Sequence, residues 1–239
     1  MSDIYFIRHG FTPANNVGYN KQEGVRNVII DDDKCPLDKE YGIKQVAETG
    51  EFLSEELKGK KILFYVSPHT RTKETLAIIY EKIKNNVDSI DIKEEKSICE
   101  INQGLAYATT PNELYEVLGE EAKIFQELHI STNSLGVSFP MGESMVEAKR
   151  RVRHFDKQLK KQRVEGRYDA IVIVSHFDII KLIHELLTGE MPPKQYTASV
   201  IKVGSGLIYV PKTVVPKGYE IPLENYQVES EICGKNRKQ

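Results

Sequence analysis

The chain has 239 residues, 40% of them hydrophobic, and a formal net charge of −2. That length suits a single domain, and the apolar share is enough for a sizeable core. A charge so close to zero gives no bulk attraction to nucleic acid or to a membrane surface. No apolar stretch is long enough to cross a bilayer, and the first residues follow a strand pattern rather than that of a signal peptide. We therefore expect a cytoplasmic protein that binds neither nucleic acid nor membrane.

The first half of the chain alternates strand and helix signals. Residues 4–7 and 62–66 are continuous apolar runs, as expected for strands buried on both faces of a parallel sheet. Between these runs, small and apolar residues recur at the spacing of one helix face, at Val46, Gly50, Leu53 and Leu57. This succession predicts a strand, a core-facing helix and a second strand.

Two helix starts follow in the middle of the chain. Thr110, Pro111 and Glu113 fit the N-cap, the first position and the third position of a helix. Ser144 and Glu147 form a second capping-box pattern. The second helix then carries a core-facing stripe at Ala148, Val152, Phe155 and Leu159.

The last third of the chain returns to strands. Residues 170–174 form a third continuous apolar run, followed by a helical segment rich in Ile and Leu. Residues 199–203 and 207–210 flank Gly204-Ser205-Gly206, which predicts two strands joined by a tight turn. The overall pattern is typical of a largely parallel sheet with helices on both faces.

These elements predict one α/β domain over residues 1–239. Within it we expect a lid insertion at about 101–143 and a frayed tail at about 230–239. The three cysteines are Cys35, Cys99 and Cys233, which are far apart and show no CxxC spacing. They are therefore expected to be reduced thiols rather than a disulfide scaffold or a zinc site.

Charged and polar side chains follow each predicted buried strand. Arg8 and His9 follow the first, Arg71 comes shortly after the second, and His176 follows the third. Open α/β sheets bind ligands at the carboxyl ends of their strands, and the helix N-termini at these junctions favour an anion. We expect these side chains to meet at one anion site.

This set of residues suits phosphoryl transfer. Two arginines can bind phosphate oxygens through bidentate, charge-assisted hydrogen bonds. One imidazole can attack phosphorus while a second stabilises the charge on the phosphoryl oxygens. Attack requires a neutral ring nitrogen, which a histidine pKa of about 6.5, lowered further by neighbouring cations, makes available at cell pH.

The motifs in the chain resemble those of the histidine phosphatase superfamily, the phosphoglycerate-mutase-like group with an Arg-His-Gly motif. They occur in the order of that family and extend from residue 4 to about residue 187. The matching elements are Arg8-His9-Gly10 with Thr12 and Asn15, Pro36-Leu37 with Gly42 and Gln45, Ser67-Pro68 with Arg71, Glu100 with Gly104, Gly142-Glu143-Ser144 with Glu147, and Ser175-His176.

The resemblance implies a three-layer α/β/α sandwich with a mostly parallel central sheet. It implies a phosphatase that forms a phosphohistidine intermediate on His9, with His176 as a second catalytic imidazole. Glu100 would protonate the leaving oxygen and then activate the attacking water, the two-way role of one carboxyl group.

The resemblance also implies the binding residues and partners. Arg8 and Arg71 would hold the phosphate of a small-molecule ester, with Thr12 and Asn15 lining the same pocket. No metal or cofactor is expected, because the cationic side chains take over charge stabilisation. The oligomeric state is left open, with a homodimer among the alternatives.

The chain departs from the family pattern in two places. Phe177-Asp178 follows His176 where many members have glycine. We expect the ring either to narrow the pocket entrance or to reshape the backbone beside the phosphate, and the carboxylate to lie in the first turn of a helix. Between residues 101 and 148 the only Lys or Arg is Lys123. Phosphoglycerate mutases of the family bind a carboxylate-bearing substrate with lid cations, so this acidic lid favours a phosphatase whose substrate carries little charge beyond its phosphate.

Two alternative functions remain. One is a phosphoglycerate-type mutase, and the other is a non-catalytic regulatory module that binds a phospho-ligand. Glu143 and Asp178 compete with Glu100 as proton donor, and Thr12-Pro13 also fits an N-cap with its first helical residue.

The remaining histidines and the basic segment have simpler interpretations. The other histidines are interpreted as structural, namely His69, His129, His154 and His184. Residues 149–163 contain eight Lys or Arg, which we interpret as the solvated face of the helix that carries the 148–159 stripe.

Overall fold

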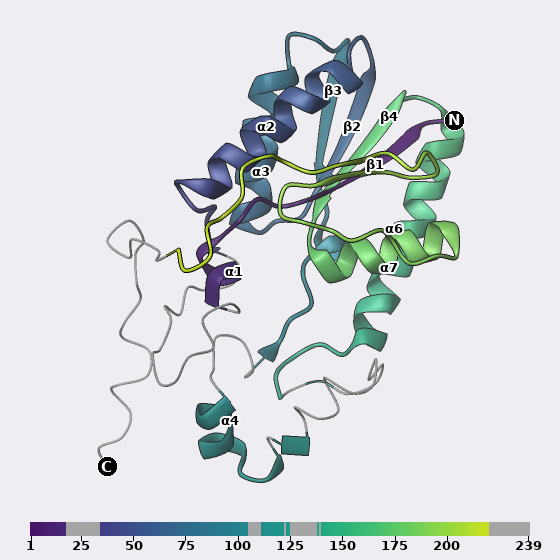
Figure 1. Ribbon diagram of the computed structural model, residues 1–239. Helices are drawn as coiled ribbons and strands as arrows, with labels where there is room; N and C mark the ends of the chain where they lie inside the picture. The colour runs from purple at the N-terminus through teal and green to yellow at the C-terminus, as the bar shows by residue number, and fades with distance from the viewer. Residues whose placement is uncertain (18–33, 105–110, 122, 125–137, 139, 220–239) are drawn as a thin grey trace.

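One twisted six-stranded sheet forms the centre of the protein (Figure 1). The computed structural model describes residues 1–17, 34–104, 111–121, 123–124, 138 and 140–219. The strand order is β3-β2-β4-β1-β5-β6. The strands are β1 (Asp3–Arg8), β2 (Lys61–Val66), β3 (Ser89–Glu94), β4 (Ala170–Ser175), β5 (Val200–Lys202) and β6 (Ile208–Tyr209).

The first four strands in sequence pair in parallel, and the last two are antiparallel. The sequence patterns correctly predict β1, β2, β4 and the β5–β6 hairpin, but β3 was not anticipated. β3 is an edge strand whose side chains are almost all exposed, so it lacks the apolar run that marks its buried neighbours.

Helices cover both faces of the sheet, which confirms the predicted three-layer α/β/α architecture (Figure 1). α2 and α3 lie on one face, and α6 and α7 lie on the other. The helices are α1 (Pro13–Val17), α2 (Tyr41–Glu56), α3 (Thr70–Ile83), α4 (Pro111–Leu118), α6 (Met145–Glu165) and α7 (Phe177–Thr188), with a short 3-10 helix, η2 (Lys96–Ile98).

The alternation of side chains along β1 divides the core into these two layers. Ile4 and Phe6 pack with the buried residues of α6 and α7, whereas Tyr5 and Ile7 pack with those of α2 and α3. Because both faces of the strand are covered, every residue from position 4 to position 7 is buried. The continuous apolar run follows directly from this burial.

The helix patterns predicted from sequence are largely confirmed. Ser144 caps α6, accepting a hydrogen bond from the backbone of Glu147 while the Glu147 side chain accepts one in return. The predicted stripe of α6 is fully buried, at Ala148, Val152, Phe155 and Leu159.

Only part of the predicted lid at 101–143 falls within the described residues, and the tail at 230–239 lies outside them. Among the described helices, none combines the length and apolar character needed to cross a membrane.

Candidate active site

The carboxyl ends of β1, β4 and β2 lie level with one another, and this alignment brings the candidate residues together. Arg8 is opposite Ser175 in the β1–β4 register. The next amide, that of His9, donates to the Ser175 carbonyl oxygen at 3.1 Å. On the other side of β4, the Ser67 amide donates to the Val174 carbonyl oxygen, also at 3.1 Å. The chain therefore turns from strand to helix three times at one edge, as the sequence predicts.

Two imidazoles meet at this edge. The ring centroids of His9 and His176 are 5.2 Å apart, with the ring planes inclined at 59°. Both side chains are buried. Burial, followed by the positive charges of Arg71 and its neighbours, lowers the pKa of His176 well below the ordinary value, so this ring is neutral at cell pH.

The tautomer of His9 is set by its own backbone. Nδ1 lies 2.8 Å from the Gly10 carbonyl oxygen, and a carbonyl only accepts, so Nδ1 carries the proton. In the neutral ring the lone pair is then on Nε2. Gly10 is required at this turn because a Cβ there would lie 2.5 Å from the Val46 methyl group. The turn thus fixes the neutral His9 ring as the Nδ1–H tautomer.

The two arginines reach the site from different elements. Arg71 lies in the first turn of α3, where it is buried and close enough to His176 to depress its pKa. Arg8 ends β1, and its guanidinium carbon lies 5.1 Å from the centre of the Phe177 ring. The Phe177 side chain therefore forms a cation–π contact with Arg8. Asp178 lies in the first turn of α7, as expected, and pairs with Lys181 at 3.3 Å.

Thr12 and Asn15 form a capping pair at the start of α1. The Thr12 hydroxyl donates to Oδ1 of Asn15 at 2.9 Å, and the Asn15 amide donates back to the Thr12 hydroxyl at 3.3 Å. The structure thus shows the N-cap that Thr12-Pro13 also predicts. A role of these two residues in substrate binding stays a prediction.

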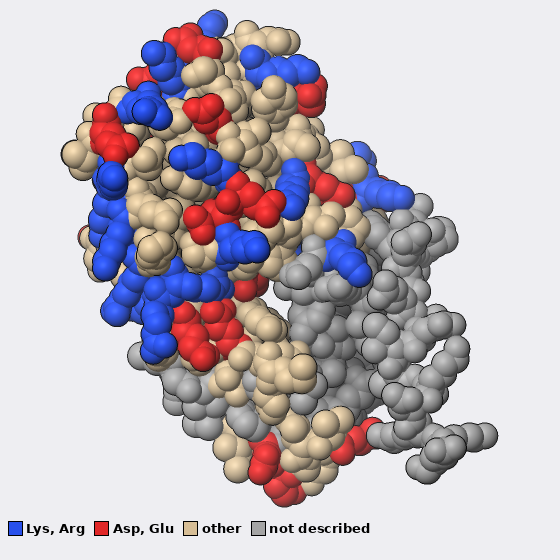
Figure 2. All heavy atoms as spheres, turned by 180° about the vertical axis from the view of Figure 1, so that it is seen from behind, with Lys and Arg blue, Asp and Glu red and all other residues tan. Residues whose placement is uncertain are grey.

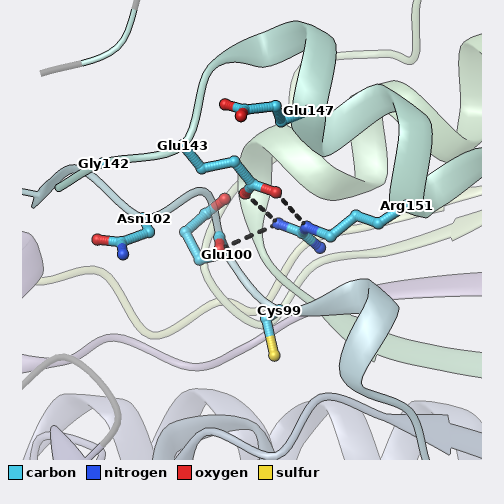
Figure 3. Close-up of a pocket in the computed structure, with 7 residues that line it drawn as sticks. All are labelled: Cys99, Glu100, Asn102, Gly142, Glu143, Glu147 and Arg151. Atoms are coloured by element: carbon cyan, nitrogen blue, oxygen red, sulfur yellow. Dashed lines mark hydrogen bonds and ion pairs between the residues drawn. The ribbon is translucent and has the colours of Figure 1, made fainter.

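Glu100 lines a cavity of about 370 Å³ (Figure 3). None of His9, Arg71 and His176 lines this cavity. The pocket is therefore distinct from the imidazoles and arginines at the strand ends, which are predicted to bind phosphate and are called the phosphate end below. The link between them is Ser175, whose hydroxyl donates to the Ile98 carbonyl oxygen at 2.8 Å and anchors the segment that leads to Glu100. The full lining is Cys99, Glu100, Asn102, Gly142, Glu143, Glu147 and Arg151.

Arg151 is the central cation of this pocket and corrects the interpretation of the basic segment. Its guanidinium binds both carboxylate oxygens of Glu143, at 2.7 and 2.8 Å (Figure 3). It also donates to the backbone carbonyls of Ser97 and Glu100, at 2.7 and 3.2 Å. The other cations of α6 fit the solvated face that the sequence predicts, and Figure 2 shows Lys and Arg gathered along the edge of the molecule on the side of α6.

His69, a buried residue that the sequence pattern did not assign to the site, contacts it through Ser67. The Ser67 hydroxyl lies 2.8 Å from Nε2 of His176 and 3.1 Å from Nδ1 of His69. His69 is therefore part of the site and not the remote structural residue that we expected. The spacing of the Ser67-to-Arg71 motif carried the signal, since His69 lies between two residues already placed at the site. Among the described residues, no group of three or more His, Cys, Asp or Glu could hold a metal ion.

Solved structures with a similar fold include phosphatases and a mutase. The α-ribazole phosphatase from Shigella flexneri is 20% identical, with a TM-score of 0.62 over 91% of this chain and 99% of that chain. Phosphoglycerate mutase from Bacillus anthracis is 17% identical, with a TM-score of 0.62 over 89% and 92%. Mycobacterial glucosyl-3-phosphoglycerate phosphatase is 17% identical, with a TM-score of 0.57 over 84% and 90%.

Sequence comparison identifies the family. No curated protein matches the sequence significantly. The family model described as histidine phosphatase superfamily (branch 1) matches residues 4–208, from the second residue of β1 to the first residue of β6, and includes every strand end of the site. The chain belongs to the histidine phosphatase superfamily.

Proposed function

We propose that this chain hydrolyses a phosphate monoester through a phosphohistidine intermediate on His9. The observation that carries the proposal is the pair of buried imidazoles at one sheet edge, 5.2 Å apart and flanked by Arg8 and Arg71. One imidazole has its Nε2 lone pair set by the backbone, and the other is held neutral by burial and by neighbouring cations.

The proposed reaction has two steps. In the first, Nε2 of His9 forms a bond to phosphorus while the ester P–O bond breaks and the leaving oxygen takes a proton from Glu100. In the second, water attacks phosphorus, gives its proton to the Glu100 carboxylate and displaces His9, which releases inorganic phosphate. Arg8, Arg71 and His176 stabilise the charge on the phosphoryl oxygens in both steps.

The contacts of the competing carboxylates favour Glu100 as the proton donor. Glu143 is bound by Arg151 through both of its oxygens, so this carboxylate is already engaged by a protein cation. Asp178 is paired with Lys181 on the outer side of α7. Glu100 is the remaining candidate, and it lies on the segment that Ser175 anchors to the end of β4.

The pocket chemistry favours a phosphatase and a leaving group with little negative charge. The described lining contains the carboxylates of Glu100, Glu143 and Glu147 against the single cation of Arg151. Because Glu143 already neutralises Arg151, a second carboxylate on the substrate would meet net repulsion. A neutral, hydroxyl-bearing leaving group avoids this cost.

Trapping the intermediate tests the proposal directly. The protein is mixed briefly with p-nitrophenyl phosphate, quenched, and assayed for bound phosphate that is labile in acid and stable in base. We expect wild-type protein and a His154→Ala control to give a burst of such phosphoprotein, and His9→Ala to give none. Full hydrolysis by His9→Ala would overturn the mechanism.

A substrate panel separates the phosphatase from its alternatives. The panel contains neutral sugar phosphates, an α-ribazole phosphate, glucosyl-3-phosphoglycerate, and 3-phosphoglycerate with a bisphosphate primer. We expect inorganic phosphate to be released faster from the uncharged leaving groups than from the two glycerates. Faster isomerisation than hydrolysis of 3-phosphoglycerate would identify a mutase, and vanadate binding without turnover on any ester would identify a binding module.

A further inference from the structure

Ser67 joins two buried imidazoles through one hydroxyl group. Its Oγ lies 3.1 Å from Nδ1 of His69 and 2.8 Å from Nε2 of His176. Ser67 and His176 are fully buried, and His69 is 5% exposed. The two rings also touch edge to face, with centroids 4.6 Å apart. This contact is separate from the pairing of His9 with His176.

A serine hydroxyl has one proton, so it donates to only one of the two rings and accepts from the other. In the first arrangement, His69 donates from Nδ1 to Ser67, and Ser67 donates to Nε2 of His176. The neutral His176 then carries its proton on Nδ1. In the second arrangement both bonds run in the opposite direction, and Nδ1 of His176 carries a lone pair.

The other nitrogen of His176 decides between these arrangements. Nδ1 is buried and has no hydrogen-bond partner among the described residues. A phosphoryl group offers acceptor oxygens only, so a lone pair on Nδ1 would repel it and an N–H would bind it. An unpartnered buried donor also becomes satisfied when the ligand arrives, which converts a cost of the empty site into binding energy.

We propose that His69 is a positioning residue that acts through Ser67 to hold His176 as the Nδ1–H tautomer, ready to donate to a phosphoryl oxygen. The inference rests on the proposed function, because the hydrogen bonds of Ser67 allow both tautomers and the acceptor oxygens of a phosphoryl group favour the one with Nδ1–H. The charged or titratable groups around His176 are Arg71, His9, His69 and Arg151. Each of these groups disfavours a second proton on the His176 ring, so the ring stays neutral. The relay, which is the hydrogen-bonded chain from His69 through Ser67 to His176, therefore controls only which ring nitrogen carries the single proton.

Nitrogen NMR tests the tautomer without any assay of activity. Histidine labelled with ¹⁵N distinguishes a protonated from an unprotonated ring nitrogen, and His176 is assigned by comparison with a His176→Asn variant. We expect Nδ1–H on His176 in the wild type, and a mixture of tautomers in Ser67→Ala and His69→Leu. His69→Asn, whose side-chain amide can donate from the position of Nδ1, should restore the single tautomer. Nε2–H on His176 in the wild type would overturn the proposal.

Kinetics then test the positioning role. We expect His69→Leu to reduce kcat/KM for p-nitrophenyl phosphate roughly tenfold, as for the loss of one hydrogen bond, with recovery in His69→Asn and no change in the exposed control His154→Leu. If His69 acts only through Ser67, His69→Leu should add no further loss in a Ser67→Ala background. Independent, multiplicative losses in the double variant would overturn the relay. Thermal melts of each variant identify any loss that comes from unfolding.

The two proposals can fail separately. If His9→Ala keeps full hydrolysis while the ¹⁵N pattern changes as expected, the phosphohistidine mechanism fails and the relay stands. If His9→Ala abolishes the burst while His69→Leu leaves the His176 tautomer unchanged, the relay fails and the mechanism stands.

Discussion

The phosphate end of the site and the adjoining pocket are built in different ways. At the phosphate end, each group comes from a strand end or from the first turn of the helix after it, such as His9 after β1 and Arg71 in α3. The pocket is assembled from two chain segments, residues 99–102 and 142–147, and is tied together by one side chain, Arg151 of α6. The first is rich in cations and imidazoles, whereas the second is rich in carboxylates.

This difference separates the part that contacts the phosphate of every ester from the part that distinguishes one leaving group from another. Paired strands fix the relative positions of backbone atoms, so residues at their ends are held rigidly and suit a reaction common to all esters. The pocket depends on side-chain contacts between distant segments, so it can change with little effect on the phosphate end. Mutations at the phosphate end should therefore affect every ester alike. Mutations of pocket residues other than Glu100, the proposed proton donor, should affect esters unequally.

The largest effect is expected for Arg71→Gln. Removing one preorganised cation from the phosphoryl oxygens should reduce kcat/KM by about 10²–10³. The loss should be of similar size for p-nitrophenyl phosphate, a sugar phosphate and a glycerate, because all three present the same phosphate. The matched control is Lys73→Gln, an exposed cation of the same helix that pairs with Glu94. A loss that differs widely between esters would contradict the separation of the two parts.

The phosphate end is also the part that the sequence predicted best. An apolar run followed by Arg8-His9 or by Ser175-His176 specifies both the strand and the residue at its end. The strand register then brings these residues to the same level of the sheet, because parallel strands buried on both faces pair with their apolar runs aligned. His69 was missed because a histidine next to a helix start is ambiguous until its hydrogen-bond partner is known.

Arg151→Met should have the next largest effect, and mainly on the pocket. It removes hydrogen bonds to Glu143, Ser97 and Glu100, and leaves Glu143 unpaired in a partly buried position. We expect a loss of about 2 kcal/mol in the free energy of unfolding, measured by urea denaturation, and a change in the ranking of the ester panel. Glu143→Gln combined with Arg151→Met should recover part of the stability, because neither charge is then left alone. Equal losses for all esters would show that Arg151 acts on the phosphate end.

Arg151 shows why the pocket was harder to predict. It lies among many cations of a helix whose outer face is solvated, and its residue type does not distinguish it from them. Its position three residues after Ala148 and four before Phe155 places it at the border of the buried stripe, which is the one local signal that separates it from its neighbours. Its backbone partners Ser97 and Glu100 are far away in sequence, and Glu143 precedes the helix, so no helical periodicity encodes these contacts.

The buried His176 predicts how stability depends on pH. Its pKa is lowered in the folded protein, first by burial and then by Arg71, while the unfolded chain has the ordinary value near 6.5. Below pH 6.5 His176 is protonated in the unfolded state and stays neutral in the folded state. The free energy of unfolding therefore falls with decreasing pH, by up to about 1.4 kcal/mol per pH unit. Urea denaturation at pH 7.5, 6.5 and 5.5 should show this loss, and His176→Asn should show less of it. The exposed His154→Asn should keep the wild-type slope, and an unchanged slope in His176→Asn would exclude His176 as its source.

The smallest effect is expected for Phe177→Leu, which probes the border between the phosphate end and its surroundings. The Phe177 ring lies 5.1 Å from the guanidinium carbon of Arg8 and 5.0 Å from Nζ of Lys181. Leu keeps an apolar side chain but removes the cation–π contact that orients the Arg8 guanidinium. Loss of this contact, worth about 0.5–1 kcal/mol, should lower kcat/KM two- to fivefold for every ester. Lys181→Met removes the other cation from the same ring and should leave kcat/KM unchanged. If Phe177→Leu instead accelerates bulky esters and leaves small ones alone, the ring acts by narrowing the entrance and not by orienting Arg8.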